Sequence, residues 1–250
     1  MILLIDIGNT RIKWARLADG RIHDQSAAPH AQMNRDEFIH TVLDPPGRPD
    51  RVVAANVGGA RIGELTAECV RQRWNIEAQF VQSTREACGV RNAYREPAKL
   101  GVDRWLALIA ARAIERRAVC VASIGTAMTV DGLDADGRHL GGVIVPGPDL
   151  MVASLFRNTS DIAQRAQHGE STKALFADNT RAAVEQGAAH ALAALIERAM
   201  ETMASETKNQ PVLILTGGAS FRIETQLKLP ASVVPDLVLR GLAVLADGDG

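Results

Sequence analysis

The sequence has no excess of charge of either sign and no long apolar run. Lysine and arginine number 28 against 29 aspartates and glutamates, which gives a net charge of −1. Proteins that bind nucleic acid or anionic membranes through their overall field carry a positive excess. Stretches such as 105–111 are far shorter than the roughly 20 apolar residues of a membrane span, and the first residues lack the basic region of a signal peptide. We therefore expect a soluble, cytoplasmic protein that acts on a small polar metabolite.

Cysteine is also scarce. Cys69, Cys88 and Cys120 lie far apart, are odd in number and show no C-x-x-C spacing or neighbouring histidine. These features argue against a disulfide framework and against a zinc site. We expect the three side chains to be buried and to act as small hydrophobic residues.

Strand and helix patterns alternate along the chain, which predicts the α/β class. The 250 residues, 46% of them hydrophobic, can form one large core or two smaller ones, and the usual domain size favours two. Apolar, β-branched runs predict strands, and spaced apolar residues predict helices; the strands are 2–5, 12–17, 52–55, 78–81 and 118–122, and the helices 35–43, 62–74 and 102–114. A polar pair, Arg116 and Arg117, precedes the last of these strands. We therefore expect domains at 1–116 and 117–250.

The same local arrangement occurs near the start of both halves. "LIDIGNTRIKWARL" and "VASIGTAMTVDGL" each have aliphatic residues, a small or acidic polar residue, Ile-Gly, Asn or Thr, and a second extended segment. Gly8 and Gly125 permit a tight turn that a ligand can approach closely, and its N–H groups, with Asn9, Thr10 and Thr126, can donate to phosphate oxygens. Each motif alone is more often an ordinary hairpin turn. Their repetition favours a nucleotide-binding protein.

A third strand ends in "VLILTGGAS", where adenine or ribose could lie against the bare backbone of Gly217 and Gly218. A lone Gly-Gly after a strand is otherwise mostly a turn. The sequence has no P-loop Gly-Lys-Ser/Thr and no G-x-G-x-x-G between a strand and a helix. The phosphate turns therefore belong to neither of these common nucleotide-binding motifs.

Over almost its whole length the chain resembles the type III pantothenate kinases. The resemblance lies in motifs that follow one another in the family's order: "DIGNTRIKW", "YREPAKLGVDRW", "GTAMTVDGLDADGRHLGGVIVPG", "LTGGA" and "PDLVLRGLA". The family belongs to the superfamily of acetate and sugar kinases, actin and heat-shock chaperone ATPases, whose two ribonuclease H-like domains enclose a nucleotide cleft. The resemblance implies ATP-dependent phosphorylation of pantothenate to 4'-phosphopantothenate, the first step of coenzyme A biosynthesis, by a homodimer.

The resemblance also implies an ATP site in the two hairpins and the Gly-Gly turn. Its residues are Asp6, Ile7, Gly8, Asn9, Thr10, Arg11, Ile12, Lys13, Thr126, Gly217 and Gly218. Asp6 stands at a strand end beside the phosphate turn, where its carboxylate could hold hydrated Mg²⁺ or simply cap the turn. Lys13 could reach a phosphate or be an exposed strand lysine.

The pantothenate site implied by the resemblance contains Tyr94, Gly101, Val102, Asp103, Arg104 and Thr180. Asp103 is the candidate general base, although an Asp in a first helical turn is commonly a helix-dipole partner. Arg104 offers a fork of donors to a carboxylate or hydroxyl, or is a surface arginine at a helix end. Tyr94, the only tyrosine, could instead anchor its polar loop. Thr180 could equally be the N-cap of the Ala-rich helix that follows, and that helix is either an ordinary core helix or near the dimer interface.

The sequence departs from the family at Ser123, where the family usually has an aspartate that holds a monovalent cation. A hydroxyl offers only a dipole, so we expect K⁺ or NH₄⁺ to bind weakly here or to be dispensable. The segment "RNTSDIAQ" is also unlike the family's usual run.

Two alternatives remain: a kinase for another small hydroxylated substrate, and a regulatory nucleotide-binding relative with little catalysis. Asp6, Asp103 and Arg104 argue against the second.

Overall fold

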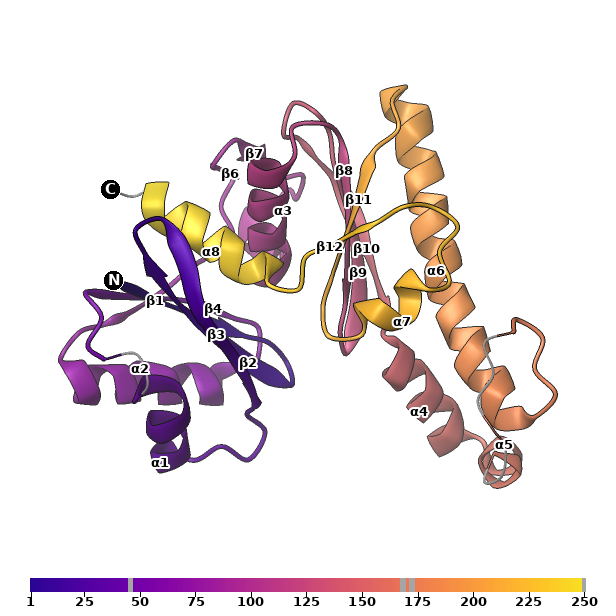
Figure 1. Cartoon of the computed structure of the whole chain (residues 1–250), viewed down its shortest axis with the longest axis horizontal. Helices are drawn as coiled ribbons and strands as arrows, with labels where there is room; N and C mark the ends of the chain where they lie inside the picture. Colours follow the sequence, from indigo (N-terminus) through magenta and orange to yellow (C-terminus); the bar gives the residue numbers. More distant parts are fainter. Residues whose placement is uncertain (45–46, 167–169, 171–173, 249–250) are drawn as a thin grey trace. The chain divides into compact units, whose positions relative to one another are not determined.

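The computed structural model describes residues 1–44, 47–166, 170 and 174–248. The helices and strands alternate as expected for the α/β class (Figure 1). The first part of the chain forms β1 (Ile2–Ile7), β2 (Arg11–Ala18), β3 (Arg21–Pro29), α1 (Arg35–Phe38), η1 (Ile39–Leu43), β4 (Arg51–Asn56), α2 (Ala60–Trp74), β5 (Ala78–Phe80), β6 (Glu86–Ala87), β7 (Val90–Arg91), η2 (Pro97–Lys99) and α3 (Val102–Ile114). The rest forms β8 (Val119–Ile124), β9 (Ala127–Leu133), β10 (His139–Pro146), α4 (Pro148–Asn158), α5 (Ser160–Arg165), α6 (Thr180–Thr207), β11 (Val212–Thr216), α7 (Ser220–Glu224), β12 (Ser232–Val233) and α8 (Leu237–Gly248).

Two five-stranded sheets repeat the same strand order. The first is β3-β2-β1-β4-β5 and the second is β10-β9-β8-β11-β12. In each, a hairpin of antiparallel strands is followed by strands that pair in parallel, β4 with β1 and β11 with β8. The repetition seen between the two glycine turns therefore extends to whole sheets, and the expected fold class is confirmed.

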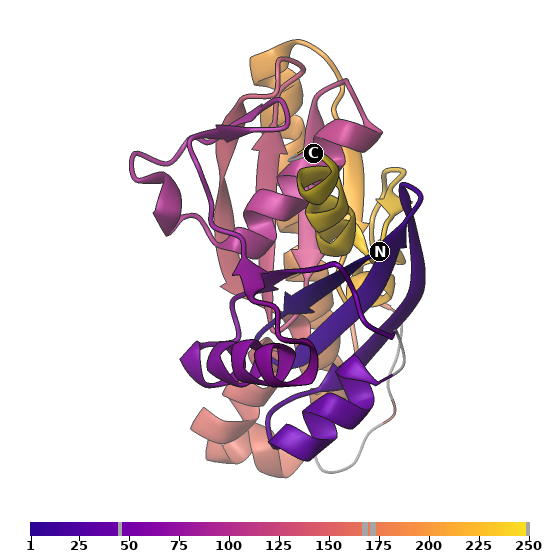
Figure 2. The ribbon, with the colours of Figure 1, turned by 90° about the vertical axis from the view of Figure 1, so that its left-hand side faces the viewer.

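Both faces of the first sheet are covered by helices, because its central strands are apolar on both sides. Leu3 and Ile5 of β1 pack with Phe38 and with the apolar face of α2. Leu4, on the opposite face, packs with residues of α3 and α8. Figure 2 shows α2 and α8 on opposite sides of these strands. The predicted buried helix at 102–114 is confirmed, since nearly every residue from Val102 to Ala111 is buried.

The helix expected at 35–43 is present but changes its winding. α1 begins with a capping box in which Asn34 accepts from the Glu37 amide and Glu37 accepts from the Asn34 amide, both at 3.0 Å. From Ile39 the turns widen, and the Asp44 amide donates to the Ile39 carbonyl at 2.9 Å. This wider, π-type winding was not visible in the apolar spacing.

The second sheet packs its hydrophobic face against α6. Cys120, Ala122 and Ile124 of β8 contact a stripe along this helix that includes Leu192 and Ile196 (Figure 1). The stripe repeats at helical spacing, so one long amphipathic helix covers the face. The expectation of a helix after Thr180 is confirmed over Thr180–Thr207.

The chain forms two compact units, and its last helix belongs to the first. Unit 1 comprises 1–114, 137–139 and 236–250, and unit 2 comprises 115–136 and 140–235. α8 joins unit 1 through its packing on α3 and β1, and Asp236, just before it, accepts a hydrogen bond from Gln25 of β3 at 2.7 Å. The expected division at residue 116 differs from these units because it assigns α8 to the second sheet. Among the described residues, no helix is long and apolar enough to cross a membrane.

The cysteines are only partly as expected. Cys69 and Cys120 are buried, and burial raises the pKa of both thiols, that of Cys120 to about 12 with the nearby Asp131 adding to the effect. Cys88 is exposed, so the prediction that it is a core residue is wrong. It lies in the turn between β6 and β7 with φ of 49°.

Candidate functional site

The turn at 8–10, named the first phosphate turn for its expected role, links β1 to β2 in unit 1. The Gly8 amide donates to the Arg11 carbonyl at 3.0 Å, and Ile7 pairs with Ile12 on the far side of the turn. Asn9 and Thr10, at its tip, are exposed. The turn therefore presents polar side chains and backbone groups to solvent, as a phosphate site requires.

Asp6 is buried at the base of this turn, directly across the hairpin from Lys13. Only 7% of Asp6 is exposed, and Lys13 is partly buried, so it is not an exposed strand lysine. Burial raises the pKa of Asp6 to about 6; the positive charge of Lys13 opposes this shift and the negative charge of Asp103 adds to it. A buried carboxylate with a nearby second carboxylate has a strong reason to bind a cation.

Asp103 lies in the first turn of α3, and Gly101 makes room for its carboxylate. A Cβ at Gly101 would stand 2.7 Å from Oδ1 of Asp103. The same Oδ1 accepts a hydrogen bond from the Arg104 amide at 2.8 Å, and the Trp105 amide donates to the Gly101 carbonyl at 3.0 Å. Asp103 is partly exposed. The helix start thus holds the carboxylate in a fixed orientation at an accessible edge of unit 1.

The loop that carries Tyr94 is held by two other side chains. The buried amide of Asn92 donates to the Thr84 carbonyl at 3.1 Å, while its oxygen accepts from the Tyr94 amide at 3.0 Å. Arg85 donates to the carbonyls of Tyr94 at 3.0 Å and Arg95 at 2.8 Å. The loop is therefore ordered by hydrogen bonds that do not involve the Tyr94 ring.

Arg104, Tyr94 and His139 form a stacked group in unit 1. Nη1 of Arg104 donates to the Tyr94 hydroxyl at 2.9 Å, and its guanidinium carbon is 5.7 Å from the centre of the Tyr94 ring. The Tyr94 and His139 rings are 6.2 Å apart and inclined by 11°. Arg104 is only 6% exposed, so the alternative of a surface arginine is wrong. The first two residues were expected at one site; His139 was not, because nothing near it in the sequence pointed to Tyr94.

The second phosphate turn lies in unit 2, between β8 and β9. The Gly125 amide donates to the Ala127 carbonyl at 3.0 Å, so this turn is one residue shorter than the first. The Gly147 amide donates to the Thr126 carbonyl at 2.8 Å, and the Ala219 amide, beyond the Gly-Gly turn, donates to the Ile124 carbonyl at 3.1 Å. Gly125 and Thr126 are exposed, as is Gly218. The structure therefore brings the expected residues Thr126, Gly217 and Gly218 to one end of the second sheet.

Gly217 is required where it stands. Its φ is 92°, and a Cβ there would overlap the backbone of Ile124. Only glycine combines this conformation with so close an approach. The Gly-Gly turn is therefore held against the second phosphate turn by backbone contact.

Ser123 lies beside two threonines near the end of β8. It is in register with Thr129 of β9 and Thr216 of β11. Residues in register on neighbouring strands point to the same face of a sheet. Ser123 thus lies in the middle of a row of three hydroxyl-bearing residues.

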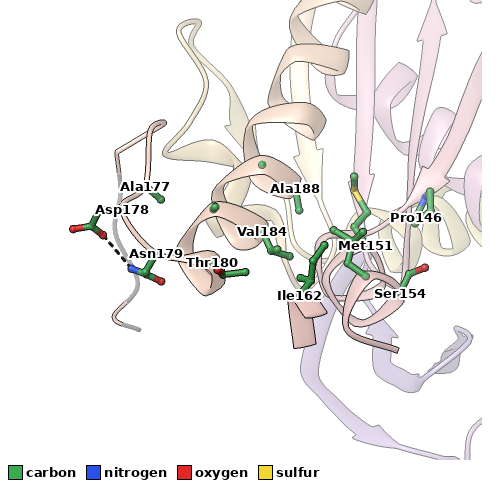
Figure 3. A pocket seen from close by; sticks show the side chains of 13 residues that line it. Pro146, Met151, Ser154, Ile162, Ala177, Asp178, Asn179, Thr180, Val184 and Ala188 are labelled. Atoms are coloured by element: carbon green, nitrogen blue, oxygen red, sulfur yellow. Dashed lines mark hydrogen bonds between the residues drawn. The ribbon is translucent and has the colours of Figure 1, made fainter. Parts of the chain in front are cut away.

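Thr180 is at the first position of α6 and lines an apolar pocket of unit 2. The pocket has a volume of about 860 Å³ and is lined by residues of α4, α5 and α6, including Leu155. Figure 3 shows Met151 and Val184 in its lining. The N-cap of α6 is Asn179, whose side chain accepts from the Ala182 amide at 3.0 Å. The alternative of Thr180 as N-cap is therefore wrong, and its hydroxyl is not used for that purpose.

Comparisons with known proteins agree with these features. Residues 2–202 match the sequence profile of the family described as type III pantothenate kinase. The chain is 39% identical to the type III pantothenate kinase of Nitrosococcus oceani over 98% of this chain and 94% of that protein. It is 42% identical to that of Azoarcus sp. (strain BH72) over 100% of this chain and 92% of that protein.

Solved structures agree on the fold. A Baf-family protein from Campylobacter jejuni has a TM-score of 0.61 at 21% identity, covering 99% of this chain and 98% of that one. The activator of 2-hydroxyisocaproyl-CoA dehydratase from Clostridium difficile has a TM-score of 0.56 at 13% identity, covering 99% and 94%. Such low identities show the fold alone, whereas the full-length relatives at about 40% identity show the family. The chain belongs to the type III pantothenate kinase family.

Proposed function

We propose that this protein transfers the γ-phosphoryl group of ATP to the hydroxyl of pantothenate, giving 4'-phosphopantothenate and ADP. The observation that carries the proposal is the pair of carboxylates in unit 1: Asp6 at the base of a phosphate turn and Asp103 close enough to raise its pKa. Phosphoryl transfer needs charge to be neutralised and the attacking hydroxyl to be oriented. Asp6 suits the first task, and Asp103 suits the second.

Asp6 is the residue proposed to hold Mg²⁺, which neutralises phosphate charge when it is bound with ATP. The fit is good, because a buried carboxylate with a raised pKa gains by facing a cation. Within the described ranges, no three His, Cys, Asp or Glu side chains gather as a metal site, so water and phosphate would supply most of the oxygens. Lys13, across the hairpin from Asp6, is positioned to attract a phosphate.

The phosphate turn of each unit is proposed to bind nucleotide phosphate. In the first, the residues are Ile7, Gly8, Asn9, Thr10, Arg11 and Ile12, and in the second they are Thr126, Gly217 and Gly218. The exposed turn tips support this role, because their N–H groups and hydroxyls can donate to phosphate oxygens.

Asp103 is the proposed general base. As the pantothenate oxygen forms its bond to the γ-phosphorus, the bond from that phosphorus to the bridging oxygen breaks, ADP leaves, and Asp103 accepts the hydroxyl proton. An ordinary carboxylate is a weak base, but a loose transition state demands orientation more than basicity. The hydrogen bond from the Arg104 amide to Oδ1 supplies that orientation.

Arg104 and Tyr94 are proposed to bind pantothenate, with Gly101 and Val102 shaping the start of α3. The buried guanidinium is a fork of charged donors held in one orientation by Tyr94, which suits it to the substrate's carboxylate. Thr180 is proposed to contact pantothenate through a hydroxyl that the helix cap does not need.

We further propose a homodimer and a weak monovalent-cation site. Apolar side chains are exposed in one region of unit 2, on β10 and α4, including Ile144 at 61% and Leu155 at 42%. Such exposure is typical of an interface, and Leu155 also lines the Thr180 pocket. Ser123, Thr129 and Thr216 would offer K⁺ or NH₄⁺ hydroxyl oxygens without a full charge.

The test is a coupled assay with purified protein, Mg²⁺ and ATP, in which ADP release is followed with pantothenate, simple sugars or glycerol as acceptor. Rapid turnover with pantothenate alone supports the proposal. Faster turnover with a sugar would replace it with the alternative of another small-substrate kinase. No turnover with any acceptor, together with measurable ATP binding, would favour the regulatory alternative.

A further inference from the structure

His30 is a buried polar residue at the first phosphate turn, and none of the roles proposed above involves it. It follows β3, is only 4% exposed, and places Nε2 at 2.7 Å from the Gly8 carbonyl oxygen. Its own amide donates to the Thr10 carbonyl at 3.3 Å. One residue thus contacts both sides of the turn tip, through its ring and through its backbone.

The hydrogen-bond partner fixes the tautomer of the ring. A carbonyl oxygen only accepts, so Nε2 must carry the hydrogen. Nδ1 is buried and has no hydrogen-bond partner among the described residues. A proton on Nδ1 would be buried without an acceptor, which is costly. The neutral ring with its hydrogen on Nε2 therefore matches this environment.

His30 is itself held in place by α2. Arg61 donates from Nη2 to the His30 carbonyl at 2.9 Å and to the Ala31 carbonyl at 3.3 Å, and from Nη1 to the Met33 carbonyl at 3.4 Å. The Gly8 carbonyl is enclosed on another side by Gly58, where a Cβ would come within 2.6 Å of its oxygen. The carbonyl that His30 binds is therefore confined by backbone and ring together.

Fixing the Gly8 carbonyl also fixes the next amide. The C=O of Gly8 and the N–H of Asn9 belong to one planar trans peptide, in which the two groups point in opposite directions. Because the carbonyl points to the buried ring, the Asn9 N–H points to the exposed side of the turn. A rotated peptide would present a carbonyl oxygen to the phosphates instead, and glycine at position 8 makes such rotation easy.

We propose that His30 is a positioning residue for nucleotide binding: its Nε2–H holds the Gly8 peptide so that the Asn9 amide faces the phosphates. This inference rests on the proposed role of the turn in ATP binding. Its effect falls on the affinity for Mg·ATP and not on that for pantothenate, because the ring donates its hydrogen bond to the turn.

The experiment compares His30→Met with His30→Gln. The two new side chains have similar length and volume, but only glutamine can donate to the Gly8 carbonyl. KM for Mg·ATP, KM for pantothenate and kcat are measured, together with calorimetric binding of Mg·ADP without pantothenate. His23→Phe, an exposed histidine on β3, serves as the control.

We expect His30→Met to weaken Mg·ATP and Mg·ADP binding about tenfold, the usual effect of losing one buried hydrogen bond. His30→Gln should restore affinity to within about threefold, and KM for pantothenate should stay constant in all variants. If His30→Met does not fold, His30→Asn replaces it, because its shorter amide cannot reach the carbonyl. Equal losses in Met and Gln variants, or unchanged nucleotide affinity in both, would overturn the inference. An inactive wild-type protein that still binds Mg·ADP would contradict only the proposed function.

Discussion

Arg104 and Tyr94 are joined twice, by a hydrogen bond of 2.9 Å from Nη1 to the hydroxyl and by the guanidinium lying 5.7 Å from the ring centre. They are ten residues apart in the chain and come from a loop and a helix start. The pairing holds a buried cation in one orientation. We therefore expect both residues to contribute to pantothenate binding.

Tyr94→Phe should raise KM for pantothenate about five- to tenfold, because the arginine loses one neutral partner worth about 1 kcal/mol. KM for ATP should stay constant. Steady-state kinetics with each substrate varied in turn give both values. Tyr94→Leu, which also removes the ring that stacks on His139, should have the larger effect. Unchanged pantothenate affinity in both variants would show that the pair is structural.

Asp103→Asn should lower kcat by about two or more orders of magnitude, the usual range for a positioned acid or base, while the protein stays folded. The matched control is Asp36→Asn, which removes an aspartate from the first turn of another helix, α1. Turnover and circular dichroism are measured for both. Near-normal turnover in Asp103→Asn would leave the residue with only its helix-dipole role.

Asp6 should make the metal-free protein less stable as pH rises. The pKa of Asp6 is about 6 in the folded protein against an ordinary value of 3.8, so between these values the folded state holds more protons than the unfolded state. Its stabilising contribution, full below the lower value, is lost as pH passes about 6. The loss approaches about 3 kcal/mol at roughly 1.4 kcal/mol per pKa unit.

The measurement is urea unfolding in EDTA, without nucleotide, from pH 4 to 8 for wild type and Asp6→Asn. The free energy of unfolding of the wild type should fall relative to that of the variant as pH rises. Parallel curves would mean that burial does not perturb this carboxyl.

In binding measurements, Asp6→Ala should weaken Mg·ATP binding while pantothenate binding stays largely intact.

Ser123→Asp should shift half-saturation by K⁺ to lower concentration. A carboxylate supplies the full charge that the three hydroxyl residues in this row lack. Activity is titrated with K⁺ and NH₄⁺ in a bulky-cation buffer at constant ionic strength, with Ser123→Ala as the control. Tight activation of the natural protein, unaltered in Ser123→Asp, would place the ion site on other residues.

Cys88 should be the only thiol that reacts quickly with an alkylating reagent in the native protein. Cys69 and Cys120 are buried, and burial raises the pKa of both thiols, so they lack accessible thiolate. Intact-mass analysis should find one rapid adduct in buffer and adducts on all 3 cysteines in denaturant. Rapid labelling that persists in Cys88→Ser would contradict this assignment.

The elements that depend on neighbouring residues could be predicted from the sequence alone. Strands at 2–5 and 118–122 and a helix at 102–114 were predicted because side-chain periodicity and turn residues are local signals. The structure has them at Ile2–Ile7, Val119–Ile124 and Val102–Ile114. The two glycine turns were found for the same reason, since a tight turn requires particular residues at particular positions. Asp6 and Asp103 were found as candidates because each lies in a motif that the family shares.

The contacts that those residues make could not be predicted from the sequence and were revealed by the folded structure. It buried Arg104 against Tyr94, raised the pKa of Asp6, and placed His30 on the Gly8 carbonyl. It also packed α8 on the first sheet, although the helix follows the second in the chain. These outcomes depend on burial and on contacts between distant segments, and neither has a counterpart in local sequence. The apolar pattern of a helix predicts that one face is buried, but it does not predict which sheet that face packs against.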